Sequence, residues 1–112
     1  MEHPAGRIAT PRLTVDRAAI EEFCRRWKIT EFSFFGSILR DDFGPGSDVD
    51  VMVSFGDDAN WSLFDHVQME DELEEIFGRH VDLVNRRAVE RSRNWIRRRA
   101  ILESVEPYLV SR

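Results

Sequence analysis

One short segment, residues 48–55 with the sequence DVDVMVSF, constrains the possible folds of this chain more than any other. After Asp50 the segment is apolar apart from one serine, and it is too short for a typical helix. A strand that is apolar on both sides is expected inside a sheet that is covered on both faces. The sequence therefore predicts a central strand here, with helices packed against its sheet.

Other elements follow from the spacing of apolar and turn-forming residues. Apolar residues at helical spacing predict a helix that begins after an N-cap at Thr14 and that places Cys24 in the core. Further strands are predicted at Ile29–Phe35 and at residues 80–85. A short helix is predicted at residues 37–40, before a loop rich in glycine and proline.

Two more helices are predicted in the second half of the chain. Ser62 and Asp65 have the spacing of a capping box at the start of one helix, and Gly78 is suited to end it. The last helix is predicted at residues 94–105. The residues of these two regions that we expect to pack in the core or to cover it are Trp61, Leu63, Val67, Leu73, Ile76, Phe77, Trp95, Ile96, Ile101, Leu102 and Val105.

The predicted elements occur in the order helix, strand, short helix, strand, helix, strand and helix. This order indicates an α/β (α+β) domain, in which a small sheet is flanked by helices. The chain has 112 residues, which is enough for one domain with one modest core. Residues 1–13, with two prolines and a glycine, are expected to form a loose N-terminal arm, and residues 14–112 a single domain.

Composition narrows the possible functions. The single cysteine, Cys24, excludes an internal disulfide and favours a reducing, cytoplasmic location. The N-terminus has no apolar run typical of a secretory signal, and no segment approaches the roughly 20 apolar residues of a membrane helix. The net charge is −5, and no basic stripe is interleaved with aromatic residues, so nucleic-acid binding is not favoured.

The basic residues are concentrated in one region of this acidic chain. Residues 86–99 contain seven arginines and one glutamate. The cluster is either a solvated helix face or a basic surface for an anion or an acidic partner. Composition does not separate these two interpretations.

Three aspartates have the placement of a metal site. Asp48 and Asp50 are two residues apart at the start of a strand, so their side chains point to the same face. Adjacent carboxylates repel one another unless a cation lies between them, and Mg²⁺ prefers such oxygen ligands. Asp82 lies within another apolar strand, where it needs a partner or a metal. If the strands are neighbours, the three carboxylates suit a two-metal site; an ion pair of Asp82 with Arg79 or Arg86 is the alternative.

A possible phosphate site precedes the first two aspartates. Gly36 would let a phosphate approach the backbone closely, and Ser37 offers a hydroxyl and a backbone N–H at the start of a short helix. Arg40, one turn later, could neutralise phosphate charge. The order of these residues therefore indicates a phosphate-binding loop opposite a metal site.

This combination resembles the signature of the DNA polymerase β-like nucleotidyltransferase superfamily, and in particular its smallest members, the minimal nucleotidyltransferases, which include the MntA-like antitoxins. The signature is Gly-Ser, about ten residues, Asp-x-Asp, and a third acid on a later strand. Here it corresponds to Gly36-Ser37, Asp48-Val49-Asp50 and Asp82, and the resemblance covers residues 32–85. It implies a short mixed sheet with flanking helices.

The resemblance also implies an activity. Asp48, Asp50 and Asp82 are expected to be catalytic and to bind Mg²⁺, and Gly36, Ser37 and Arg40 to bind the triphosphate of ATP. A hydroxyl would attack the α-phosphate, and pyrophosphate would leave.

In many minimal members this acceptor is a tyrosine of a HEPN-domain RNase toxin, encoded next to the antitoxin in a type VII toxin–antitoxin pair. The alternatives are an antitoxin that neutralises its partner by binding alone, and a nucleotidyltransferase for a small molecule.

Overall fold

The centre of the domain is a mixed β-sheet. The computed structural model describes residues 16–39, 44 and 46–110, and within them the sheet has four strands in the order β3-β2-β1-β4. β2 runs antiparallel to β1 and parallel to β3, and β4 is antiparallel to β1. The strands are β1 (Ile29–Phe35), β2 (Val49–Phe55), β3 (Val81–Asn85) and β4 (Glu106–Val110). The mixed sheet that we expected is therefore confirmed.

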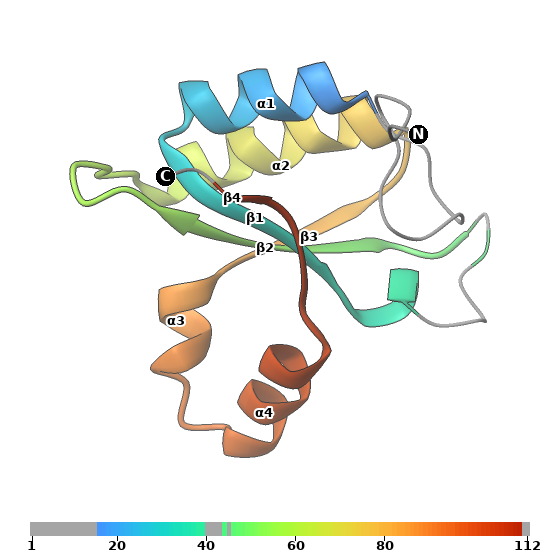
Figure 1. Cartoon of the computed structure of the whole chain (residues 1–112), viewed down its shortest axis with the longest axis vertical. Helices are drawn as coiled ribbons and strands as arrows, with labels where there is room; N and C mark the ends of the chain where they lie inside the picture. The colour runs from blue at the N-terminus through green and yellow to red at the C-terminus, as the bar shows by residue number, and fades with distance from the viewer. Residues whose placement is uncertain (1–15, 40–43, 45, 111–112) are drawn as a thin grey trace, which may run out of the picture.

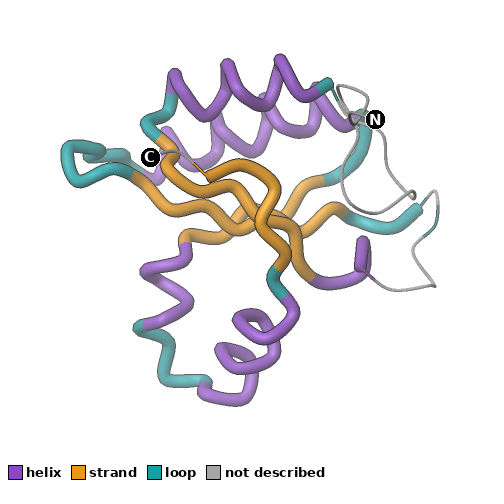
Figure 2. The backbone as a smooth tube through the Cα atoms, in the orientation of Figure 1, coloured by secondary structure: helices purple, strands orange, loops and turns teal. Residues whose placement is uncertain are grey.

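Helices cover both faces of this sheet (Figure 1). The tube view shows the two helical layers, one above and one below the strands (Figure 2). One face is covered by α1 (Arg17–Arg26) and α2 (Leu63–Phe77), and the other by α3 (Arg86–Glu90) and α4 (Trp95–Ser104). A short 3₁₀ helix, η1 (Gly36–Leu39), follows β1 directly.

β2 has buried side chains on both faces, as the sequence predicts. Val49, Val51 and Val53 belong to the main core, which lies between the sheet and α1 with α2. Met52 points to the opposite face and packs in a smaller cluster with Val89 of α3 and Ile101 of α4. The two clusters explain why this segment carries so few polar residues.

Two helix ends are formed as predicted, and one is not. The capping box of Ser62 and Asp65 begins α2, and Gly78 ends it in a left-handed conformation with φ of 72°. α1 is capped by Asp16, whose carboxylate accepts hydrogen bonds from two backbone N–H groups. The predicted cap, Thr14, lies outside the described residues, as do Arg40 and the predicted arm at residues 1–13.

Two elements were not predicted. α3 is a five-residue helix that begins immediately after β3, with the Asn85 side chain as its N-cap. β4 contains Glu106 and Pro107, which are rare in strand interiors and therefore hide the strand in the sequence. The last helix ends at Ser104, close to the predicted boundary.

Several apolar residues predicted to pack in the core are exposed. Leu63 and Val67 lie on the outer side of α2, where Met69 and Leu73 are the buried residues. Trp95 and Ile96 are exposed at the start of α4. The prediction was wrong here because helical spacing identifies an apolar stripe but does not show that another layer covers it.

Cys24 is a core residue, as predicted. Burial, together with the nearby charge of Glu21, raises the pKa of the Cys24 thiol to about 12. The thiol therefore stays protonated near neutral pH and is not a nucleophile.

Among the described residues, none of the helices has the length and apolar character needed to span a bilayer.

Glu72 joins the two helices on the first face of the sheet. Its carboxylate accepts a hydrogen bond from the indole N–H of Trp27 at 2.9 Å and one from Gln68 at 3.0 Å, and it pairs with Arg26. Partial burial alone would raise the pKa of Glu72, but these hydrogen bonds outweigh it and lower the pKa below its usual value. The ionised carboxylate therefore stabilises the packing of α1 against α2.

We predict that this contribution is lost in acid. Because the pKa of Glu72 is lower in the folded state, its stabilisation is present above its unfolded pKa of about 4.3 and is lost as the pH falls through the folded pKa. Glu72→Gln should lower the free energy of unfolding by about 1–2 kcal/mol at pH 7, and this difference should shrink below about pH 4. Urea unfolding across this pH range measures it, with the exposed Glu106→Gln as the control. A difference that does not change with pH would contradict the prediction.

Candidate active site

The parallel pairing of β2 and β3 brings two of the predicted aspartates together. Asp50 and Asp82 are direct register partners on the two neighbouring strands. Both side chains are partly buried, and both point to the face that carries α3 and α4, because Val49 and Val51 point to the other face. The condition on which the proposed carboxylate site depends, that these two strands are neighbours, is therefore met.

Asp48 lies just before β2 and is exposed. Within the described residues, no three side chains among His, Cys, Asp and Glu are close enough together to hold a metal ion. The structure thus aligns Asp50 with Asp82 but does not gather all three carboxylates. Arg86, one of the alternative partners of Asp82, pairs with Glu31 and Glu90 instead.

Gly36 lies directly against Asp50. β1 and β2 pair antiparallel so that Phe35 is opposite Asp50, and Gly36 follows with a φ of 76°. A Cβ atom on Gly36 would overlap the Oδ2 atom of Asp50 and would come within 3.1 Å of its Cγ. The position therefore requires glycine for two reasons, the left-handed backbone and the contact with this carboxylate. Ser37 follows in the backbone of η1.

Arg79 holds the loop that leads to Asp48. Its Nη1 atom donates hydrogen bonds to the backbone carbonyls of Gly44 and Ser47, both at 3.1 Å. The backbone N–H of Ser47 donates to the same Gly44 carbonyl at 3.0 Å, which closes a turn. Sequence reasoning considered Arg79 only as a partner of Asp82, since a contact with backbone carbonyls has no signal in the residue pattern.

Two glutamates of α2 bind the backbone of β3. Glu74 accepts a hydrogen bond from the N–H of Val81 at 3.2 Å, and Glu70 accepts one from the N–H of Leu83 at 3.1 Å. On the other side of the strand, the backbone carbonyl of His80, just before Val81, accepts a hydrogen bond from the N–H of Val49 of β2 at 2.9 Å. The contacts of Glu70 and Glu74 tie β3 to α2, and so they help to position Asp82. The sequence analysis did not identify them.

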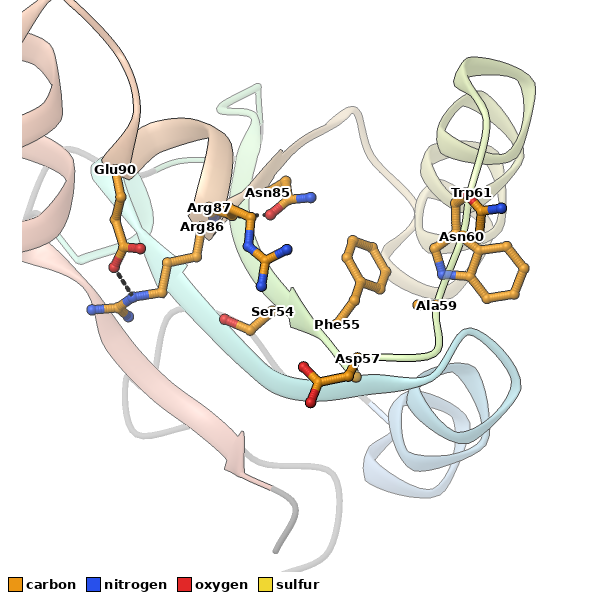
Figure 3. Close-up of a pocket in the computed structure, with 11 residues that line it drawn as sticks. Ser54, Phe55, Asp57, Ala59, Asn60, Trp61, Asn85, Arg86, Arg87 and Glu90 are labelled. Atoms are coloured by element: carbon orange, nitrogen blue, oxygen red, sulfur yellow. Dashed lines mark hydrogen bonds and ion pairs between the residues drawn. The ribbon is translucent and has the colours of Figure 1, made fainter.

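A cavity of about 420 Å³ lies at the other end of the sheet, where β2 and β3 finish (Figure 3). Ser54 and Phe55 of β2 line it, and so does Arg86, which forms an ion pair with Glu90 at 3.1 Å. The two register-paired aspartates lie at the start of the same strands. This cavity is therefore separate from the candidate active site.

Residues 17–106 match the nucleotidyltransferase domain family, and this region includes the paired strands and the contact between Gly36 and Asp50. The chain belongs to this family.

One relative and one solved structure resemble this nucleotidyltransferase domain in sequence. The protein adenylyltransferase MntA of Thermococcus cleftensis is 36% identical over 64 residues, which is 57% of this chain and 63% of MntA. A solved structure described as a candidate minimal nucleotidyltransferase is 28% identical with a TM-score of 0.61, over 81% of this chain and 87% of the other. The resemblance to minimal nucleotidyltransferases that the sequence motif indicates is therefore confirmed.

Other comparisons limit what the likeness means. The matched part covers only 54 to 64% of the length of three curated relatives, MntA included. A crystal structure of a toxin–antitoxin with AMP-PNP has a TM-score of 0.63 at 20% identity, over 80% of this chain and 69% of that chain. At this identity the likeness concerns the fold of the nucleotidyltransferase domain.

We predict that Gly36→Ala is more destabilising than the same change at another left-handed glycine. Gly78 has a φ of 72°, but a Cβ atom there would meet nothing within 4 Å. Gly78→Ala should therefore cost about 1–2 kcal/mol for the backbone alone, while Gly36→Ala adds the overlap with Asp50, about 1–3 kcal/mol more. Urea unfolding of both variants measures the difference. Equal costs would show that Gly36 does not contact Asp50 in solution.

Proposed function

We propose that this chain is a Mg²⁺-dependent protein adenylyltransferase that acts as an antitoxin. It transfers AMP from ATP to a tyrosine of a HEPN-domain RNase toxin encoded next to it. The observation that carries this proposal is the pair of register-matched carboxylates, Asp50 and Asp82, with Gly36 packed against one of them. Two neighbouring carboxylates suit a cation, and Gly36, which has no side chain, would let the phosphates held by that cation approach the backbone.

The carboxylates fit the proposed metal. Mg²⁺ is usually held by one or two carboxylates and takes its other ligands from water and substrate phosphates. Asp50 and Asp82 meet this requirement, and the exposed Asp48, two residues before Asp50, would join them when ATP brings a second ion. The metal would neutralise charge on the phosphates during transfer.

The other residues would bind ATP and the acceptor. Gly36 and Ser37 would hold the triphosphate, and Arg40 would neutralise part of its charge. The acceptor oxygen would form a bond to the α-phosphorus while the bond from that phosphorus to the bridging oxygen breaks, and pyrophosphate would leave. Asp82 would accept the proton of the attacking hydroxyl.

The partner and the acceptor rest on similarity. MntA of Thermococcus cleftensis is named a protein adenylyltransferase, and a structure with the same fold is that of a toxin–antitoxin with AMP-PNP. These relatives support a protein acceptor and an adenine nucleotide for this chain. A cytoplasmic location is the one that such a pair requires, because a toxin that cleaves RNA acts where RNA is.

One observation favours a second candidate, neutralisation by binding alone. The three aspartates do not form a cluster of metal ligands within the described residues. An antitoxin that only covers its partner would need the fold but not the metal site. The two candidates therefore differ in whether an intact carboxylate pair is required.

The test uses the protein encoded next to this chain. After incubation with this chain, ATP and Mg²⁺, the intact mass of the neighbour should rise by whole AMP units. Asp50→Asn should abolish the gain, because it removes one charge of the carboxylate pair, whereas Asp57→Asn at the far end of β2 should retain it. Removal of Mg²⁺ with a chelator should have the same effect as Asp50→Asn.

Two results would contradict the enzymatic proposal. If the neighbour gains no mass but forms a stable complex, and Asp50→Asn still neutralises its toxicity, the chain acts by binding. If Asp50→Asn transfers AMP as well as the wild type does, these carboxylates are not the catalytic site.

A further inference from the structure

The outer side of α2 carries apolar and acidic residues that nothing in the described chain covers. The side chains of Leu63, Phe64 and Val67 are 78, 87 and 49% exposed. Asp71 and Glu75 continue the same ridge at intervals of four residues, and both are exposed. Neither acid has a hydrogen bond or an ion pair within the described residues. We call this ridge, residues 63, 64, 67, 71 and 75, the acidic surface.

The loop before α4 and the start of that helix have the same design with the opposite charge. Trp95 and Ile96 are 59 and 65% exposed. Arg91 and Arg93 precede them, and both are exposed and lack an ion pair within the described part of the chain. We call these four residues the basic surface. Large apolar side chains next to unpaired charges are typical of an interaction site.

The helices that carry the two surfaces cover opposite faces of the sheet, and both reach its β3 edge. A cavity of about 370 Å³ beside β3 is lined both by His66 of α2 and by Arg97 of α4. His66 is the neighbour of Val67 in the acidic surface, and Arg97 is the neighbour of Ile96 in the basic surface. The acidic and basic surfaces are therefore close, along the chain, to residues of the two helices that meet at this cavity.

We propose that the chain binds a second copy of itself through these surfaces. In a two-fold symmetric dimer the acidic surface of each copy packs on the basic surface of the other, so that the contact occurs twice. With α2 antiparallel to the partner's α4, Val67 lies against the apolar side chains at the start of α4. Asp71 and Glu75 then extend toward the loop that carries the two arginines.

Charge complementarity favours a second copy as the occupant. Each surface needs a partner that combines apolar side chains with charges of the opposite sign, and the same chain offers both. Because the contact forms twice, it would cover both acidic surfaces, with five residues each, and both basic surfaces, with four residues each. Stable interfaces of this kind bury about 1,000 Å² or more. This inference does not depend on the proposed enzymatic function.

The test is the oligomeric state of the full chain. Sedimentation velocity should show a dimer that dissociates on dilution. Arg91→Glu with Arg93→Glu, or Asp71→Arg with Glu75→Arg, should weaken dimerisation at least tenfold, because each double variant places like charges across the contact. These side chains are exposed, so circular dichroism should show both variants folded as the wild type. An equimolar mixture of the two variants should recover a dimer, since the reversed charges match again.

Three results would overturn the proposal. The first is a wild-type chain that is monomeric up to about 1 mM, the weak end of measurable affinities. The second is a dimer that neither double variant weakens, which would place the contact elsewhere. The third is a monomeric chain that binds its genomic neighbour and loses that binding on Arg91→Glu with Arg93→Glu, which would make an acidic partner protein the occupant.

Phe64→Ser, which changes no charge, should weaken the dimer independently of the charge reversals.

Discussion

The parallel pairing of β2 with β3 is the constraint on which the rest of the structure depends. Side chains alternate between the two faces of a strand, so a shift of one residue in β3 would turn Asp82 into the core and Val81 or Leu83 out of it. The apolar residues that fill the main core thus also fix the partner of Asp50. Parallel neighbours need a long connection, and α2 supplies it while covering the same core. One set of contacts therefore sets both the stability of the sheet and the position of its carboxylates.

The parts of the fold that could be predicted are those whose stability is local or follows from a simple alternation. β1 has the predicted bounds, and the capping box at Ser62 and the left-handed Gly78 define α2 as expected. β4 could not be predicted, because Glu106 and Pro107 disfavour a strand and only pairing with β1 forms one. The exposure of Trp95 could not be predicted either, since the sequence does not show which helix faces remain uncovered.

The candidate site divides in the same way. The alignment of Asp50 with Asp82 follows from two apolar strands that each carry an acid near their start, and the sequence shows both. The contact of Gly36 with Asp50 depends on how β1 turns into η1, and the loop before Asp48 depends on carbonyls that Arg79 binds. Such contacts with backbone atoms leave no pattern in a single sequence. They nevertheless limit which residues can occupy these positions.

The glutamates of α2 have a consequence for how the molecule can meet others. β3 is a border strand of the sheet, and strands in this position can recruit another chain by backbone hydrogen bonding, which leads to sheet extension and aggregation. Glu70 and Glu74 occupy the outward N–H groups of Leu83 and Val81, so an incoming strand would have to displace two carboxylates and leave them beside its own carbonyls. The sheet is thus closed to addition of a strand at this border. Recognition on this side of the molecule is left to side chains, whose shape and charge can select one partner over another.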